Sequence, residues 1–459
     1  MNRVARRSLV VLIFVLALLA GVIFFSIEFV IHGDSWATFQ GSPHVYNGSN
    51  INCGVILDRR GVELLDLTDG RDYSNDASLR KATIHWLGDR DGYISAPAVA
   101  YHAKAMAGFD TFNGIYAYGD AVGKASLTIS SRIQKAAQEA MGSHKGTVAV
   151  YNYKTGEILC AVSTPNYDPD NVPDIGNDDS GAFDGVYVNR FTQSSYIPGS
   201  IFKAVTLAAA LEELPDAQKM RFHCNGSYEI DGDYVTCEGS HGELNLEEAF
   251  AWSCNCAFAQ LTEALGGDNL QDYVSRFHLT ESVSFDGITT ASGNFDISSG
   301  AAVDVAWSGI GQHLDQVNPC RFLTFMGAIA GGGSCAEPYL VSEVRVGNNR
   351  TYSVDVTTSD RIMSKGTALL MQEMMRNNVE SIYGADNFPG LTVCAKSGTG
   401  EVGGDQKPNA MFCGFVMDEN YPLAFIVAVE DGGYGSRVCI PIISPILAEC
   451  KSVMDGWDY

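Results

Sequence analysis

An apolar run near the start of the chain constrains the fold more than any other feature. Residues 8–31 contain a single charged side chain, Glu28, and they follow three arginines, Arg3, Arg6 and Arg7. As a helix, this run is long enough to cross about 30 Å of hydrocarbon. Because basic residues stay on the cytoplasmic side, the sequence predicts a cytoplasmic tail over 1–7 and a transmembrane anchor over 8–31. Everything that follows is expected outside the cytoplasm.

A cleaved export signal is the alternative interpretation of this run. The run is longer than the core of a signal peptide, and no convincing small-residue cleavage site follows it. No second segment of this kind occurs before Tyr459. Both interpretations export the body of the protein, and we favour a single-pass protein of the cell membrane.

Charge and composition exclude several classes of function. The 459 residues include 54 acidic and 30 basic side chains, which leaves a net charge of −24. A surface this acidic argues against a nucleic-acid partner held by phosphate contacts. The hydrophobic fraction of 46% also excludes extensive disorder. The length allows two to three domains.

The character of the chain changes near Thr128. Residues 32–125 contain only short apolar clusters and predict a small membrane-proximal spacer domain, followed by a larger domain over 126–459. The larger domain has two early β-rich runs (146–153 and 156–163), helical segments, and three late β-rich runs (391–399, 410–417 and 422–429). This order predicts an α/β (α+β) fold with one antiparallel five-stranded sheet, assembled from both ends of a helical insertion.

Ser200-Ile201-Phe202-Lys203 is the first candidate for chemistry, at a helix start marked by Pro198-Gly199. A serine hydroxyl is a weak nucleophile that needs a base within reach. Positions i and i+3 share a helix face, so Lys203 can approach the Ser200 oxygen. Apolar neighbours would lower the pKa of the lysine and let it act as that base.

Ser253-Cys254-Asn255 is the second candidate. Residues two apart do not share a helix face, so both side chains reach one site only from a turn. The turn after the helical run at 246–252 fits this requirement. The alternative interpretation is a simple cap at a helix end.

Lys396-Ser397-Gly398-Thr399 is the third candidate, on a β-rich run. Alternation places Lys396 and Gly398 on one face of the strand, and Ser397 and Thr399 on the other. Gly398 would leave space for a substrate to lie against the backbone.

Each motif alone is common, and the chain carries a second copy of each, at 78–81, 292–294 and 154–156. The joint order SxxK, SxN and K[ST]G is far more specific, and it occurs in penicillin-binding proteins and class A β-lactamases. Beyond the motifs, this chain resembles the class B penicillin-binding proteins, the monofunctional D,D-transpeptidases, over nearly everything after the anchor. The segments that carry the resemblance are GVILDRRG (54–61), ASLTISSRIQKAAQEAM (125–141), GTVAVYNYKTGEILCAVSTPNYDPD (146–170), NRFTQSSYIPGSIFK (189–203), HGELNLEEAFAWSCNCAFAQL (241–261) and CAKSGTGE (394–401).

The resemblance implies a role for each motif residue. Ser200 would be the acylated nucleophile and Lys203 its base, while Ser253 would shuttle a proton. Asn255 would position the substrate, and Lys396 would supply positive charge. Ser397, Gly398 and Thr399 would bind the substrate, and the hydroxyls of Ser397 and Thr399 would bind its terminal carboxylate. The backbone N–H groups of Ser200 and Thr399 would form an oxyanion hole.

The resemblance implies that helices cover both faces of the sheet. It also implies the reaction and the partners. A peptidoglycan stem peptide ending in D-alanyl-D-alanine would acylate the serine, and a neighbouring amine would then complete the cross-link. β-Lactams would acylate the same residue. No cofactor is required for this chemistry. The membrane and possible other cell-wall synthesis proteins complete the expected set of partners.

Two departures from the family pattern concern subfamily assignment. In GIGQHLDQVNP (309–319), His313 stands where the family usually has glycine, and Met411 precedes Phe412 where an aromatic residue is expected. The short spacer is closest to the small class B type of Gram-positive bacteria.

Cysteines are expected to be mostly buried small hydrophobes, although disulfides persist outside the cell. Cys224 and Cys237 bracket a polar, glycine-bearing stretch typical of a hairpin, and we predict a disulfide between them. No set of cysteines and histidines has convincing zinc spacing, so no metal is expected.

Two other functions stay open at this point. A serine β-lactamase or D,D-carboxypeptidase would pass the acyl group to water, but no residue stands out as a deacylation base. A non-catalytic β-lactam sensor or wall scaffold would bind through the same fold, although sensors of that kind have several membrane spans.

Overall fold

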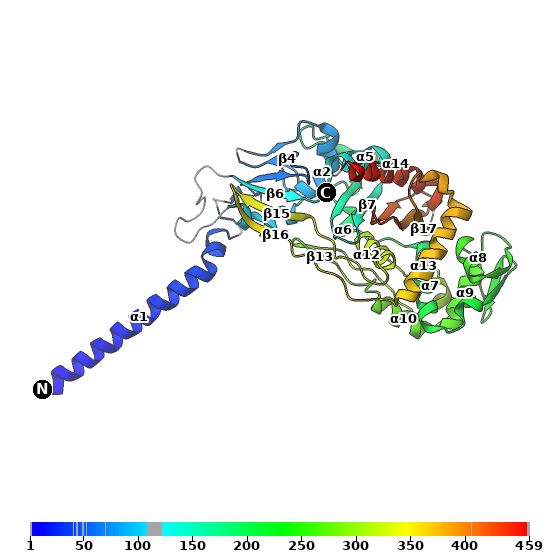
Figure 1. Ribbon diagram of the computed structural model, residues 1–459, viewed down its shortest axis with the longest axis horizontal. Helices are drawn as coiled ribbons and strands as arrows, with labels where there is room; N and C mark the ends of the chain where they lie inside the picture. Colours follow the sequence, from blue (N-terminus) through cyan, green and yellow to red (C-terminus); the bar gives the residue numbers. More distant parts are fainter. Residues whose placement is uncertain are drawn as a thin grey trace.

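We describe a computed structural model of the full chain. It describes residues 2–39, 41–42, 45–47, 50–51, 53–68, 70–107, 122–404 and 406–456. Figure 1 shows a long helix, α1 (Asn2–Ala37), that projects from the body of the molecule. A mixed sheet lies beside the end of this helix, and the larger domain follows on the far side of that sheet.

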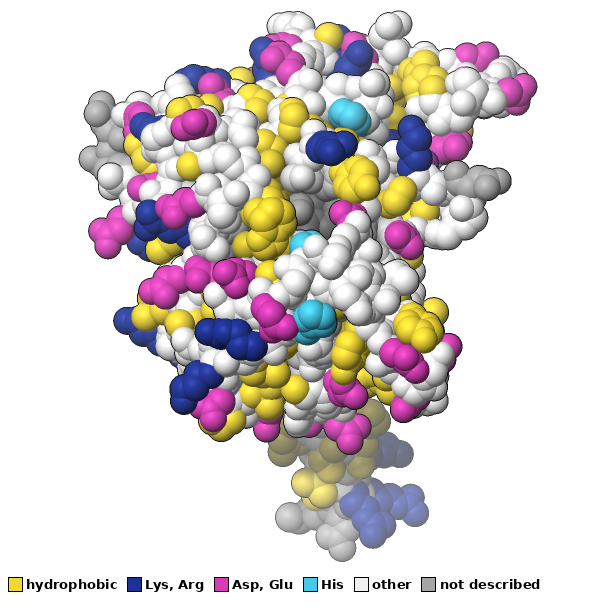
Figure 2. Space-filling model, turned by 90° about the vertical axis from the view of Figure 1, so that its right-hand side faces the viewer, with side chains coloured by type: hydrophobic (Ala, Val, Ile, Leu, Met, Phe, Trp, Pro, Cys, Tyr) yellow, Lys and Arg dark blue, Asp and Glu magenta, His cyan; other side chains and the backbone are white. Residues whose placement is uncertain are grey.

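The helix α1 matches the predicted anchor in position and chemistry. Its segment Arg3–Gly33 has a mean hydropathy of 3.1 in its most apolar window, and none of that window is buried. By length and composition this segment can cross a membrane, and it is the only such helix among the described residues. In Figure 2, basic side chains mark the far end of the fading helix.

The larger domain is built on a five-stranded sheet in which every neighbouring pair is antiparallel. Its order is β17 (Val393–Gly400), β18 (Asn409–Val416), β19 (Leu423–Val429), β7 (Gly146–Asn152) and β8 (Ile158–Thr164). Two early strands therefore join three late ones, as predicted. All residues of β7, β8, β18 and β19 are buried, which requires cover on both faces.

Helices supply that cover, which confirms the fold implied by the resemblance. On one face, α5 (Ser131–Met141) and α14 (Gly435–Asp455) pack into a common apolar cluster with the sheet. The other face carries α12 (Pro319–Ala330) and α13 (Lys365–Asn378), which belong to the main core. Figure 1 shows α5 and α14 together at the upper edge of the domain.

A helical lobe lies beside the β17 edge of the sheet (Figure 1). Its helices are α7 (Lys203–Glu213), α8 (Leu246–Ala251), α9 (Asn255–Leu265), α10 (Gly267–Arg276) and α11 (Ala302–Ser308). Four short strands in two antiparallel pairs extend from it, namely β9 (Arg221–Cys224), β10 (Ser227–Ile230), β11 (Asp233–Thr236) and β12 (Gly242–Asn245). The lobe and the sheet edge together enclose the site described below.

The membrane-proximal sheet does not follow the predicted boundary at residue 125. Its order is β16 (Asn349–Ser353), β15 (Val341–Val346), β6 (Gly123–Leu127), β3 (Val55–Leu57), β4 (Glu63–Asp66) and β5 (Asp72–Tyr73). Strands β15 and β16 come from the long segment between α12 and α13, far along the chain. The segment 32–125 is therefore only part of this sheet, because β6 pairs with β3 on one side and β15 on the other.

A helix of the spacer joins the two sheets. Helix α2 (Ala77–Leu87) packs on α5 and β8, and Trp86 Nε1 donates a hydrogen bond of 2.7 Å to Ala161 O in β8. Arg80 also pairs with Asp168 of the larger domain, at 2.6 Å between Nε and Oδ1. Short elements complete the described fold: α3 (Pro97–Tyr101), α4 (Ala103–Ala107), α6 (Arg190–Gln193), β1 (Tyr46–Asn47), β2 (Asn50–Ile51), β13 (Ser284–Phe285) and β14 (Ile288–Thr289).

Candidate active site

Ser200 lies in a tight turn that leads into a buried helix. A 3₁₀ turn covers Gly199–Ile201, and α7 begins at Lys203. Ser200 lines a cleft, whereas the side chain of Lys203 is fully buried. The motif therefore occurs at a helix start, as predicted, with the lysine behind the serine.

Lys203 is held by the second motif. Its ammonium donates to the backbone oxygen of Ser253, to Ser253 Oγ at 3.2 Å and to Asn255 Oδ1 at 2.7 Å. The Phe258 ring centroid lies 5.5 Å from the same nitrogen. Within the described contacts, Lys203 makes no hydrogen bond to Ser200 Oγ. These hydrogen bonds tie the lysine to the SxN motif, and its approach to the Ser200 oxygen stays a prediction.

The SxN motif forms the turn that its spacing required. Ser253 lies between α8 and α9 with a φ of 55°, in the left-handed region that non-glycine residues rarely adopt. This conformation brings Ser253 and Asn255 to one ammonium group. The Asn255 amide also donates to Thr236 O at 2.9 Å, which fixes it to the end of β11.

Lys396 completes the network from the sheet. Its ammonium donates to Ser253 Oγ at 3.0 Å and to Ser397 O at 3.0 Å, and the Phe250 ring centroid lies 5.7 Å away. The side chain is fully buried on the face of β17 that alternation predicts. Two lysines distant in the sequence therefore share the hydroxyl of Ser253.

Burial makes both lysines weaker bases than usual. Desolvation and, to a smaller extent, the positive charge of Lys396 together lower the pKa of Lys203 to about 7. Desolvation also lowers the pKa of Lys396 to about 7. An amine that loses its proton near neutral pH can take one from a hydroxyl, and its neighbour can retain its charge. The pair therefore provides a base and a cation side by side.

Close packing joins the turn at Ser200 to strand β17. A Cβ atom added to Gly398 would lie 2.5 Å from Pro198 O and 2.9 Å from Ile201 N. One added to Gly199, whose φ is +55°, would lie 2.2 Å from Thr399 O. The expected reason for Gly398 was space for a substrate, but the structure gives a different one. Glycine lets the nucleophile turn lie directly against the strand.

These elements surround a cleft of about 480 Å³. Its lining includes a residue of each motif, and the set of motif residues there is Ser200, Ser253, Asn255, Ser397, Gly398 and Thr399. The exposed rings of Trp252 and Tyr434 also line it. Figure 2 faces the end of the molecule opposite α1, where hydrophobic side chains gather around a hollow near the centre.

Two residues of the site were not anticipated. Tyr383 Oη lies 2.9 Å from Ser397 Oγ and accepts a hydrogen bond of 2.9 Å from Ser397 N. Gln312 donates to Thr399 O at 3.0 Å and accepts from the backbone of Glu401 at 3.3 Å, so its amide holds β17 as a neighbouring strand would. His313, next to it, has a φ of 65°, which explains why glycine suits this position.

The second copies of the motifs lie outside the cleft. Ser78 and Lys81 are on α2, where the lysine is exposed. Thr155 lies in the turn between β7 and β8, where Asn152 Oδ1 accepts its N–H. Asn294 donates its amide to Leu314 O. Their interpretation as turn and surface residues agrees with these positions.

The predicted disulfide is not formed in the structure, in which all twelve cysteines are free. The Cys224 and Cys237 sulfurs instead both face His241 Nδ1, at 3.5 and 3.6 Å. Cys254 joins them, and the four ligand atoms lie within 4.8 Å of one another. The expectation that no cysteine–histidine set could bind metal considered spacing along the chain, whereas the fold brings distant residues together.

The fold is that of the penicillin-binding transpeptidases, and the cleft lies where their three motifs meet. The model of the penicillin-binding protein transpeptidase domain matches residues 146–448. The chain therefore belongs to this family, and its relatives place it among the class B penicillin-binding proteins.

Curated relatives and solved structures agree with this assignment. The chain is 28% identical over 341 residues to peptidoglycan D,D-transpeptidase PbpA of Mycolicibacterium smegmatis, covering 68% of each protein. It is 28% identical to stage V sporulation protein D of Bacillus subtilis, over 70% of this chain and 52% of that one. The ceftriaxone acyl-enzyme of penicillin-binding protein A from M. tuberculosis aligns with a TM-score of 0.75 and 25% identity, over 87% of this chain and 98% of that one. The D,D-transpeptidase domain of a peptidoglycan glycosyltransferase from Eggerthella lenta also has a TM-score of 0.75, with 26% identity over 88% and 99%.

Proposed function

We propose that this protein is a peptidoglycan D,D-transpeptidase that works through an acyl-enzyme on Ser200 and is inhibited by β-lactams. The observation that carries the proposal is the network in which Lys203 contacts Ser253 and Asn255 and Lys396 contacts Ser253, at the cleft that Ser200 also lines. Membership of the family supports the same reaction. The relatives named peptidoglycan D,D-transpeptidase and the β-lactam acyl-enzyme of the similar structure supply the substrate class and the inhibitor class.

Acylation begins at the hydroxyl of Ser200. Neutral Lys203 accepts the serine proton as Oγ attacks the carbonyl carbon of the penultimate D-alanine. Backbone N–H groups of Ser200 and Thr399 stabilise the oxyanion, a role in which one donor contributes about 3–4 kcal/mol. The proton passes through Ser253 to the departing amine, the peptide bond breaks, and D-alanine leaves. Ser200 is then esterified by the stem peptide.

Transfer reverses the proton path. The amine of a neighbouring stem peptide attacks the ester carbonyl and loses a proton to Lys203. This proton then passes to Ser200 Oγ, which becomes a hydroxyl again. A peptide cross-link forms as the ester bond breaks. Before acylation, the hydroxyls of Ser397 and Thr399 bind the terminal carboxylate of the donor, which later leaves with D-alanine. Lys396 supplies positive charge there, and Asn255 binds the donor's amide.

The anchor sets where this reaction takes place. The arginines before the apolar helix remain in the cytoplasm, so the catalytic domain lies outside the membrane. Its substrates are stem peptides of the cell wall. The membrane-proximal sheet sets the distance between the membrane surface and the cleft that binds them. Other proteins of wall synthesis are the natural partners at this location.

Labelling with a fluorescent penicillin tests the nucleophile. The full-length Ser200→Ala variant is expected to lose covalent labelling completely, while Ser78→Ala, the matched serine of the second SxxK copy, labels as the parent does. Peptide mapping of the parent adduct should place the added mass on the peptide containing Ser200. Persistent labelling of Ser200→Ala would refute the assignment. Release of the drug within seconds would favour a hydrolase instead of a transpeptidase.

A further inference from the structure

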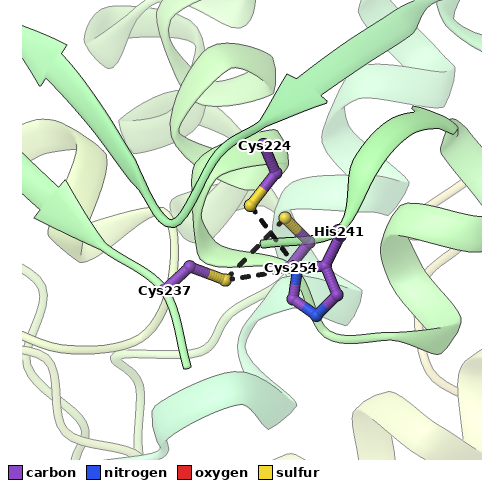
Figure 3. A group of neighbouring side chains, drawn as sticks. All are labelled: Cys224, Cys237, His241 and Cys254. Atoms are coloured by element: carbon purple, nitrogen blue, oxygen red, sulfur yellow. Dashed lines mark hydrogen bonds between the residues drawn. The ribbon is translucent and has the colours of Figure 1, made fainter. Parts of the chain in front are cut away.

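Four side chains that have no part in acyl transfer converge next to the SxN turn. Figure 3 shows Cys224, Cys237, His241 and Cys254 pointing toward a common centre. Cys224 ends β9, Cys237 follows β11, His241 precedes β12, and Cys254 is the N-cap of α9. Three backbone segments thus deliver the four ligand atoms: the end of β9, the connection between β11 and β12, and the start of α9.

Three of the six distances between these atoms fit the edges of a metal tetrahedron, and all six are within 4.8 Å. Bond lengths of about 2.3 Å for Zn–S and about 2.0 Å for Zn–N give edges of about 3.8 Å between sulfurs and about 3.5 Å between sulfur and nitrogen. The Cys237 and Cys254 sulfurs are 3.9 Å apart. His241 Nδ1 lies 3.5 Å from the Cys224 sulfur and 3.6 Å from the Cys237 sulfur. A disulfide needs sulfurs at about 2.0 Å, so the arrangement suits a metal better than a bridge.

The surroundings fit thiolate ligands and an oriented imidazole. Cys254 is at the N-terminus of α9, where Ala257 N donates to its sulfur at 3.4 Å, and a helix N-terminus favours negative charge. The His241 ring lies against the Trp252 ring, with centroids 6.0 Å apart. Cys224 and Cys254 are buried, and Cys237 and His241 are partly buried.

A cross-link would stabilise the short strands around the cluster. Strands β9–β12 form two separate two-stranded sheets of four residues per strand. Pairs of this size are marginal on their own in water. A metal that joins the end of β9, the end of β11 and the start of β12 would hold this module to α9.

We propose that Cys224, Cys237, His241 and Cys254 bind one Zn²⁺ ion that holds the SxN turn in place. Three cysteines and one histidine complete a tetrahedron and leave no position for substrate, so the site is structural. Binding releases the three thiol protons to solvent. The ion would fix Cys254, whose neighbours Ser253 and Asn255 both contact Lys203. It would also fix Cys237, beside the Thr236 oxygen that anchors Asn255.

Metal analysis of the full-length protein in detergent tests the site. Purified without added metal or chelator, it is expected to contain about one zinc per chain. Cys237→Ser and His241→Ala should lower that content several-fold. Cys335→Ser, a buried cysteine elsewhere, and His223→Ala, an exposed histidine of the same module, should leave it unchanged. Chelation followed by Co²⁺ should give the visible absorption of a tetrahedral thiolate site in the parent protein, a readout that needs no variant to fold.

Thiol titration under denaturing conditions with chelator separates the outcomes. Twelve reactive thiols together with stoichiometric zinc support the proposal. A metal-free protein with two fewer reactive thiols would show that a disulfide forms instead of the zinc site. Twelve reactive thiols without zinc or Co²⁺ binding would also contradict the proposal. Removal of zinc should slow penicillin acylation several-fold without abolishing it, because the acylated residue is not a ligand. If Ser200 proves not to be the acylated residue, we still expect one zinc per chain, so the two proposals are tested independently.

Discussion

Two segments of this chain carry the same Ser-x-x-Lys spacing at the start of a helix, and they differ in their surroundings. In α2, Asp76 caps the helix through Ser78 N and Leu79 N, and Lys81 points into solvent. In α7, Lys203 is fully buried beside the Phe258 ring and close to a second buried lysine, Lys396. Spacing puts a lysine near a serine in both cases. Burial and a charged neighbour are what turn one lysine into a base, because they lower its pKa.

Replacing each lysine in turn is the strongest test of whether only the buried one acts as a base. Lys203→Met is expected to slow penicillin acylation by about 10³-fold, because a general base contributes 10²- to 10⁴-fold. Lys81→Met should not change the rate. Rapid-mixing kinetics with a fluorescent penicillin measures both, and melting temperatures establish that each variant folds. Equal rate losses in the two variants would contradict the distinction.

The pH dependence of acylation tests the effect of burial. Lys203 acts as a base only when it is neutral, and its pKa is about 7. The acylation rate should therefore rise about tenfold per pH unit below neutrality and level off above it. Lys396→Met removes a positive charge that lowers the pKa of Lys203, so the rising limb should move to higher pH. A flat profile, or a shift to lower pH in that variant, would argue against Lys203 as the base.

Tyr383 offers a finer test of how the sheet side of the cleft is held. Tyr383→Phe removes the hydroxyl that contacts both the backbone and the side chain of Ser397. We expect kcat/KM to fall about tenfold, which corresponds to about 1.4 kcal/mol. Tyr234→Phe, which removes an exposed hydroxyl, is the control. Unchanged kinetics in Tyr383→Phe would make this contact irrelevant to the reaction.

The smallest expected effect on activity belongs to the other helix start. Asp76→Ala removes the N-cap of α2 and its contact of 2.6 Å with Lys135 Nζ. Loss of such a cap costs about 1 kcal/mol of unfolding free energy. Thermal unfolding should show a lower midpoint, with acylation kinetics equal to the parent. Asp91→Ala, an exposed carboxylate, should change neither, and slowed acylation in Asp76→Ala would link α2 to the cleft.

The central fold and the three motifs could be predicted because they are local or periodic. β-rich runs at both ends of the domain indicated a five-stranded sheet, and that sheet formed from the same runs. The turn at Ser253 followed from the fact that residues two apart do not share a helix face. Gln312 lay in a stretch already identified by resemblance, so a closer study of that stretch could have found it.

Other features depend on contacts that sequence patterns do not record. Tyr383 reaches Ser397 from the π-helical turn Val379–Tyr383 that follows α13, and nothing in this segment of the sequence indicates the contact. The cysteine–histidine cluster is spread over 31 residues of sequence from Cys224 to Cys254, and only Cys237 and His241 lie close together in the sequence. Strands β15 and β16 have an ordinary strand pattern, which cannot state which sheet they will join.

The shared membrane-proximal sheet has a practical consequence for anyone who trims this protein. A fragment that starts at residue 126 keeps every motif but lacks most of β6, so the edge of β15 would be uncovered. An exposed strand edge has unpaired backbone N–H and C=O groups that can pair with another chain, which promotes aggregation. Shortened versions intended for crystallisation or drug screening should therefore be cut between α1 and β3, so that the whole six-stranded sheet is retained.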